Sequence, residues 1–149
     1  MHRTITSFIK VGMIGTLLMS LSCTDAGVDP EAAEPPPPPG TEIFFSQHIQ
    51  PIFNNNGCVS CHGGSGGLFL NQGQSYQNLV NVNAQAACTN KKRVLPGNPD
   101  ESVLYIRVES NTPNTECGVN SRMPQGSPRL PEETINVIKD WILQGAKNN

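Results

Sequence analysis

The sequence predicts a small all-α domain with long loops rich in Gly and Pro. Three segments place apolar residues at helical spacing, and no segment shows the alternation that is typical of a strand. Gly, Asn, Pro and Ser dominate the stretches between these segments, and no internal repeat is evident. Residues 41–149 are long enough for one domain, and the chain contains only 5% aromatic residues. We therefore expect a single thin hydrophobic core.

The first predicted helix carries an apolar stripe, and Pro51 is expected to kink or restart it. Its stripe consists of Phe44, Phe45, Ile49, Ile52 and Phe53. A second helix is expected to open at Asn98-Pro99-Asp100-Glu101. Asn98 would be the cap, Pro99 the first helical residue, and Glu101 the acid three residues after the cap. It would continue through Val103, Leu104, Ile106 and Val108.

The last predicted helix opens at Pro131-Glu132-Glu133 and ends near Gly145. Its apolar face would consist of Ile135, Ile138, Trp141 and Ile142. A short further helix is expected around residues 76–80. The chain between residues 111 and 128, and between 63 and 67, is predicted to form loops.

The sequence predicts three parts: an N-terminal segment typical of exported proteins (1–22), a tether (23–40) and the domain (41–149). Arg3 and Lys10 give a basic start, and Val11 to Leu21 is an apolar run too short to span a bilayer. This combination predicts a signal peptide. The tether has four acids, no base and five consecutive prolines, so we expect it to be extended and semi-rigid.

The segment Ser20-Leu21-Ser22-Cys23 resembles a bacterial lipoprotein cleavage site, with its small and apolar residues in exchanged places. Cys23 would then be the lipid-modified first residue of the mature protein. Cleavage after Ala26 is the alternative, and it would release a soluble exported protein.

The pattern Cys58-Val59-Ser60-Cys61-His62 matches the attachment site of a c-type haem. Two thiols about one helical turn apart can add to the two vinyl groups of a porphyrin, which assigns Cys58 and Cys61 to covalent attachment. The imidazole of His62 would coordinate the iron from the proximal side. A thioredoxin-like redox pair, a zinc site and a chance match are the alternatives. The thioredoxin-like pair would need alternating strands and helices around it, and the zinc site would need a second metal-binding pair; the sequence shows neither.

Two further cysteines, Cys88 and Cys117, are left after the haem and the lipid site are assigned. In an oxidising compartment we expect them to form a disulfide, which in the entropic view would stabilise the domain by about 3 to 4 kcal/mol. Two buried thiols are the alternative.

The candidates for the second axial ligand of the iron can be reduced by elimination. Export would leave Met123 and His48 as the ordinary candidates. Met123 lies in Arg122-Met123-Pro124 within a loop that can fold over the ring, whereas His48 belongs to the first helix and is expected to face solvent or bond a neighbour. We favour Met123, which would raise the reduction potential relative to a second His. An open or water-filled position is the third possibility.

The charge of the predicted domain argues against a nucleic-acid partner, because residues 41–149 contain eight basic and eight acidic residues. The run Lys91-Lys92-Arg93 could dock an acidic redox partner or screen haem propionates, but a solvated loop is the ordinary interpretation.

These parts together, over about residues 42–146, resemble the single-haem class I cytochrome c domains of planctomycete and related bacterial exported proteins. The motifs that carry the resemblance are Ile49-Gln50-Pro51-Ile52-Phe53, Cys58 to Gly63, Gly66-Gly67-Leu68, Pro96-Gly97-Asn98-Pro99, Ser102-Val103-Leu104-Tyr105, Arg122-Met123-Pro124, Trp141-Ile142 and Gly145-Ala146. The loop between Cys88 and Cys117 departs from the pattern. The backbone acceptor that would orient the imidazole of His62 has no assignment.

The resemblance implies a small helical fold around one covalent haem c, with the first and last helices crossing beside it. It implies attachment at Cys58 and Cys61, axial ligation by His62 and Met123, and single-electron transfer. We expect an electron carrier rather than an enzyme, anchored by lipid in the periplasm or at the outer surface, with redox proteins there as partners. A haem peroxidase or gas sensor with an open distal site is the alternative, and a purely structural lipoprotein is the third.

Overall fold

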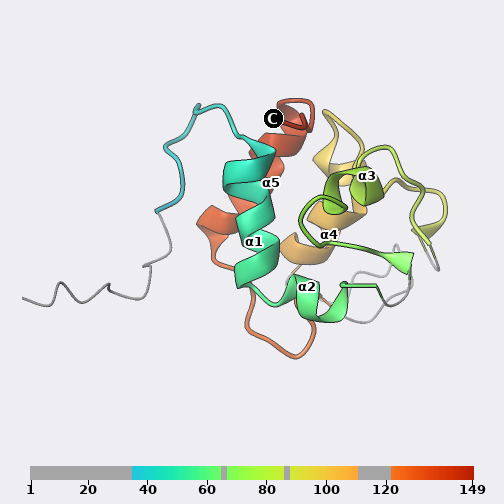
Figure 1. Ribbon diagram of the computed structural model, residues 1–149. Helices are drawn as coiled ribbons and strands as arrows, with labels where there is room; N and C mark the ends of the chain where they lie inside the picture. Colours follow the sequence, from blue (N-terminus) through green and yellow to red (C-terminus); the bar gives the residue numbers. More distant parts are fainter. Residues whose placement is uncertain (1–34, 65–66, 86–87, 111–121) are drawn as a thin grey trace, which may run out of the picture. The chain divides into compact units, whose positions relative to one another are not determined.

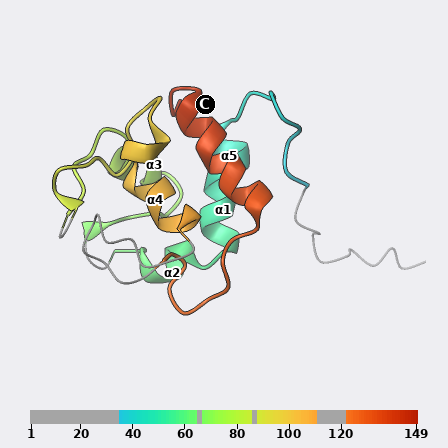
Figure 2. The same cartoon turned by 180° about the vertical axis from the view of Figure 1, so that it is seen from behind.

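The described part of the chain is helical (Figures 1 and 2). The computed structural model describes residues 35–64, 67–85, 88–110 and 122–149, which belong to a compact unit that begins at Pro35. Its helices are η1 (Phe45–Ile49), α1 (Gln50–Asn55), α2 (Cys58–Cys61), α3 (Ser75–Leu79), η4 (Pro99–Glu101), α4 (Val103–Glu109) and α5 (Glu132–Leu143). Strand pairing among these residues is limited to isolated bridges, so the prediction of a helical domain without a sheet is confirmed for them.

The first predicted helix forms in two parts that follow each other directly. The π-helical turn η1 leads into α1, and Pro51 occupies the first turn of α1. A proline is tolerated in the first turn of α1 because its missing N–H would bond no carbonyl oxygen of α1 itself. The change from η1 to α1 falls at Gln50, one residue before Pro51, which agrees with the expected restart.

The predicted helix start at Asn98 is confirmed only for one short turn, because Pro99 opens η4 but the α-helix begins later, at Val103. The Asn98 side chain caps no helix, and its amide donates instead to the carbonyl oxygen of Pro96 at 3.3 Å. Residues Pro99–Glu101 form only the short 3-10 turn η4, and α4 begins at Val103. The reason is Ser102, whose buried hydroxyl accepts the N–H of Leu95 and donates to the carbonyl oxygen of Asn98, both at 2.8 Å. These bonds hold Ser102 in an extended conformation that interrupts the helix.

Helix α5 forms as predicted. It runs from Glu132, directly after Pro131, to Leu143. The φ of +94° at Gly145 then allows the chain to turn away. Its predicted apolar face is fully buried: Ile135, Ile138, Trp141 and Ile142 are each at most 1% exposed. Helix α5 contacts η1 and α4. Helix α1, which continues η1, lies beside α5 in both Figures 1 and 2.

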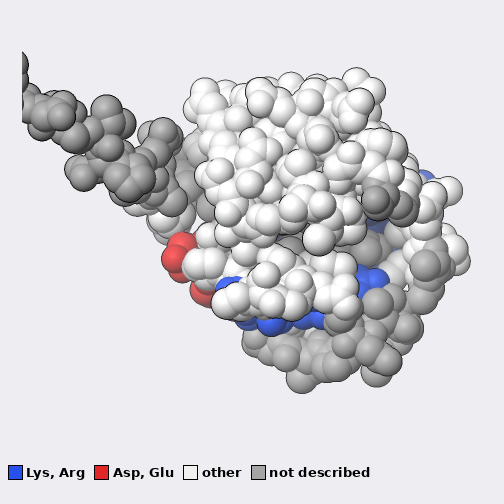
Figure 3. All heavy atoms as spheres, turned by 60° about the horizontal axis from the view of Figure 1, so that its bottom comes forward, with Lys and Arg blue, Asp and Glu red and all other residues white. Residues whose placement is uncertain are grey.

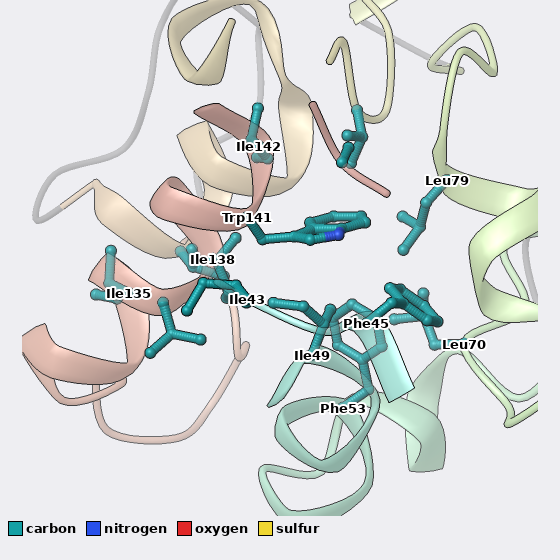
Figure 4. Close-up of a cluster of buried hydrophobic side chains, with 14 of the residues drawn as sticks. Ile43, Phe45, Ile49, Phe53, Leu70, Leu79, Ile135, Ile138, Trp141 and Ile142 are labelled. Carbon is teal, nitrogen blue, oxygen red and sulfur yellow. The ribbon is translucent and has the colours of Figure 1, made fainter. Parts of the chain in front are cut away.

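A small aromatic cluster stands at the centre of this packing (Figure 4). The ring centroid of Phe45 is 5.3 Å from that of Trp141 and 5.3 Å from that of Tyr76, which comes from α3. Trp141 donates its indole N–H to the carbonyl oxygen of Lys147 at 3.0 Å, so its polar atom is satisfied. The few aromatic residues of the domain thus hold its first helix, α3 and last helix together.

A buried polar side chain ties α1 to the loop that precedes α3. Gln50, only 4% exposed, accepts a hydrogen bond from the hydroxyl of Ser75 and donates to the carbonyl oxygen of Leu70 at 3.0 Å. The short helix α3 itself was predicted, with bounds shifted by one residue. These bonds fix the loop between α2 and α3, which borders the candidate site described below.

Several predicted segments lie outside the described residues. They include the export signal at 1–22, Cys23, residues 23–34 of the tether, and Cys117. Pro35 to Pro39 form neither helix nor strand, and a turn bond from Thr41 N–H to the Pro38 carbonyl oxygen, at 3.1 Å, leads into the domain. Within the described ranges, no helix combines the length and the apolar character that crossing a membrane requires.

Candidate haem-binding site

The two predicted attachment cysteines share one helical turn. Gly57, at φ +73°, lets the chain leave α1 and start α2, which consists of Cys58 to Cys61. His62 follows immediately, and its N–H donates to the carbonyl oxygen of Cys58 at 2.8 Å. Cys58 is half-buried and Cys61 is exposed, and both are free thiols. The motif is therefore arranged as the attachment chemistry requires, with two thiols one turn apart and an imidazole next to them.

The chain turns back directly after His62. A Cβ atom on Gly63 would lie 2.8 Å from the carbonyl oxygen of Val59, a distance that real Cβ atoms do not show, so only glycine fits there. Gly63 pairs with Phe69 in an isolated bridge, and the N–H of Leu70 donates to the carbonyl oxygen of His62 at 2.8 Å. The returning loop thereby fixes the backbone of the proximal residue.

A cavity of about 500 Å³ opens beside this turn. Cys58, Cys61 and His62 line it, together with mostly apolar side chains from α1, α4, α5 and the loops between. Its volume lies within the ~300–1,000 Å³ that is usual for sites of small molecules and cofactors. The main apolar side chains of its wall are Ile52, Phe53, Leu68, Leu70, Leu79, Leu104, Val108, Leu130 and Ile138.

Met123, the favoured distal ligand, lies on the wall of the same cavity. Its N–H donates to the carbonyl oxygen of Arg107 at 2.8 Å, so α4 holds the Met123 loop in place. Its side chain is partly buried against the hydrophobic core. The fold thus brings Met123 and the Cys58 to His62 turn together although they are far apart in the sequence.

His48, the other candidate for the distal position, does not line the cavity. Its Nδ1 accepts the N–H of Phe44 at 2.8 Å, and its ring lies against the ring of Phe44 with centroids 6.1 Å apart. The expectation that His48 bonds a neighbour is therefore confirmed, and its role is at the start of η1.

The surroundings of His62, the predicted proximal ligand, favour its neutral imidazole. Burial, and in second place the positive charge of Arg93, lower the pKa of His62. The neutral form is the one that can coordinate a metal. Burial also raises the pKa of the Cys58 thiol, an effect that a backbone hydrogen bond partly offsets and the neighbouring Cys61 reinforces. Cys58 is therefore the better shielded of the two thiols.

Two arginines, Arg93 and Arg107, are the only fully charged residues on the described wall of the cavity, and no Asp or Glu lines it. In Figure 3, basic side chains gather along a hollowed face of the molecule, while the acidic ones visible there lie to one side. A third arginine, Arg122, precedes Met123, and its buried Nη1 has no hydrogen-bond partner among the described residues. The two lining arginines and the apolar wall therefore favour a ligand that is largely apolar and carries negative charge at its edge.

These residues fit a c-type haem. The wall offers two thiols for thioether bonds, an imidazole and a thioether as the axial donor types of iron, an apolar interior and cationic groups suited to carboxylates. No group of three or more His, Cys, Asp or Glu among the described residues is placed to hold a bare metal ion. The His62 side chain forms no hydrogen bond with the described residues, so the group that would orient it stays unassigned.

Sequence reasoning missed Arg107 as a lining residue. Leu104, Arg107 and Val108 follow each other at helical spacing of three and four, so they share one face of α4. That spacing was visible in the sequence, but without the fold nothing indicated that this face borders a cavity. Arg93 was noticed only as part of the run of basic residues.

Cys88 is disulfide-bonded and only 1% exposed. The alternative of a buried free thiol is therefore wrong for this residue. Cys117, its predicted partner, lies outside the described residues, so the pairing of these two residues stays a prediction. Cys88 also lines the cavity, which places this cross-link at the candidate site.

The comparisons with known proteins identify no relative: no family model, no curated protein and no solved structure matches this chain.

Proposed function

We propose that this chain is a c-type cytochrome that carries single electrons. The observation that supports this most strongly is that Cys58, Cys61, His62 and Met123, picked out in the sequence for their chemistry, line one apolar cavity of about 500 Å³. Any of these residues alone has an ordinary structural explanation. Their convergence on a cavity of suitable size does not follow from packing alone.

Each residue has a distinct role in this proposal. Cys58 and Cys61 would hold the porphyrin by thioether bonds, His62 would supply a nitrogen ligand and Met123 a sulfur ligand to the iron. When bound, the haem supplies an iron that alternates between two oxidation states. The chain anchors the backbone of both candidate ligands, His62 and Met123, by hydrogen bonds at 2.8 Å, which would limit their movement when the iron changes its oxidation state. The apolar wall limits water at the iron, and a thioether favours the ferrous state.

The exposure of α2 supports electron exchange with other proteins. Gly57, Ser60, Cys61 and Gly63 are exposed, so the haem edge bonded to Cys61 would lie close to solvent. A redox partner in the periplasm or at the outer surface could approach it there. The proposed export signal, the lipid at Cys23 and the tether would keep the domain at a membrane surface, and the disulfide at Cys88 agrees with an oxidising compartment.

The test is expression of the full chain in a bacterium with a c-type haem maturation system, followed by denaturing gel electrophoresis and haem staining. We expect a haem-stained band at the mass of the mature chain, after removal of the proposed signal peptide. Cys61→Ala should bind haem through one thioether at most, with a changed absorption of the reduced form. Asn55→Ala, at an exposed position of α1 that does not line the cavity, should match the parent. A colourless parent protein would contradict the proposal.

A redox titration and carbon monoxide then separate the two haem functions. A carrier with Met123 on the distal face should show reversible one-electron titration and bind carbon monoxide only slowly, because the sulfur must first leave the iron. Immediate binding of carbon monoxide by the reduced parent would favour the peroxidase or gas-sensor alternative instead.

A further inference from the structure

Arg93 presents a cation to the cavity in a fixed position. Its two terminal nitrogens donate to the carbonyl oxygens of Asn78 and Gly67, both at 2.8 Å. These acceptors belong to the end of α3 and to the loop after α2, so Arg93 joins the two segments. The guanidinium lines the cavity and lies close enough to His62 to act on it electrostatically.

No carboxylate that the structure describes forms an ion pair with Arg93. The described ion pairs involve Lys91, Arg129 and Lys147, each with an exposed glutamate. Lys91 and Lys92, the neighbours of Arg93 in the basic run, bond Glu101 and Asn83 on the surface and do not line the cavity. Arg93 is therefore the one member of this run that is directed to the cavity.

The hydrogen bonds of Arg93 leave donors for a ligand. A guanidinium has five N–H donors in a planar fork, and the two backbone carbonyls use two of them. A carboxylate is the anion that this fork fits best, and it can accept from two donors at once. Since the backbone bonds already hold the group, binding an anion there costs little side-chain entropy.

We infer that Arg93 binds a carboxylate at the edge of the cofactor in this cavity, which for a haem is a propionate. The inference rests on the proposed function and goes beyond it by assigning an anion-binding residue and a determinant of reduction potential. A fixed positive charge near the iron favours the more negative, ferrous state, so Arg93 raises the potential. Arg107 adds charge on the same wall, but Arg93 alone bridges the loop behind His62.

The test compares three variants of the full chain with the parent, all matured with haem. Arg93→Gln removes the charge and keeps an amide that can still bond one backbone carbonyl. Arg93→Lys keeps the charge and loses the fork. Lys92→Gln removes the same charge one residue away, outside the cavity, and is the matched control. The measurements are haem content by staining, reduction potential, and the propionate-bending vibration in resonance Raman spectra.

We expect Arg93→Gln to lower the reduction potential by more than Lys92→Gln does and to shift the propionate vibration, which Lys92→Gln should leave in place. Arg93→Lys should keep a potential near that of the parent and still shift the vibration, because the fork is lost. If Arg93→Gln does not incorporate haem, the resonance Raman spectrum of Arg93→Lys alone tests whether Arg93 binds the propionate.

The outcomes separate the two proposals. A parent without covalent haem overturns the proposed function and this inference with it. A haem-loaded parent whose propionate vibration is the same in both Arg93 variants overturns only the inference, and assigns Arg93 to joining α3 to the loop after α2.

Discussion

The backbone N–H of Met123 donates to the carbonyl oxygen of Arg107 at 2.8 Å, which ties the loop carrying the favoured distal ligand to α4. Arg107 and Met123 also both line the cavity. One hydrogen bond therefore links a cavity-facing turn of a helix to a segment that has no regular secondary structure of its own. It explains how a loop rich in Gly and Pro can present a side chain at a defined place.

Replacing Met123 by Ala should remove the sulfur ligand without removing the haem. We expect the weak absorption band of the ferric protein near about 695 nm to disappear, the reduction potential to fall and carbon monoxide to bind readily to the reduced form. Gln125→Ala, in the same loop, should keep the band. A band that persists in Met123→Ala would show that another group occupies the distal position.

The two histidines of the domain should respond differently to replacement. His62→Ala should abolish the absorption spectrum of six-coordinate haem, since the proximal nitrogen is lost. His48→Ala should keep that spectrum and lower the free energy of unfolding by about 1 kcal/mol, because the N–H of Phe44 loses its acceptor. The reverse pattern in absorption spectra and urea unfolding would contradict our assignment of the ligand.

Gly63→Ala should destabilise the turn that follows His62. The new Cβ would lie 2.8 Å from the carbonyl oxygen of Val59, so the backbone must shift, at a cost of about 1–3 kcal/mol. Gly73→Ala is the control: its Cβ would meet no atom, and only the φ of +83° opposes it, which costs about 1–2 kcal/mol. Urea unfolding of the matured proteins measures both. Because the Gly63 turn holds His62, only Gly63→Ala should also reduce haem content.

The predicted disulfide can be checked directly by mass spectrometry of proteolytic fragments without reduction. We expect the peptide containing Cys88 to be linked to the one containing Cys117. Replacing Cys117 by Ser should then lower the free energy of unfolding by about 3–4 kcal/mol. A fragment linking Cys88 to Cys23 would contradict both the pairing and the lipid assignment.

The sequence predicted the helices where apolar spacing and end signals agree. The last helix is the clearest example, because Pro131, the buried face around Trp141 and Gly145 all indicate the same element. The start of α4 was mispredicted because Asn98 has the local features of a cap, while the buried hydroxyl of Ser102 takes up the backbone groups of the loop. That competition depends on tertiary burial, which local patterns do not contain.

The residues proposed to attach and ligate the haem could be predicted from neighbours in the sequence and from composition. Cys58, Cys61 and His62 are adjacent in one turn, so their relation is set by helix geometry alone, and composition left Met123 and His48 as the remaining donors. What only the tertiary structure decided is which distant residues share the cavity. It placed Met123 there and His48 elsewhere, and it brought Arg93 and Arg107 to the wall. The physical reason is that these placements depend on long-range packing and on loop hydrogen bonds, such as the one from Met123 to Arg107, whereas the motif depends on neighbours along one turn of helix.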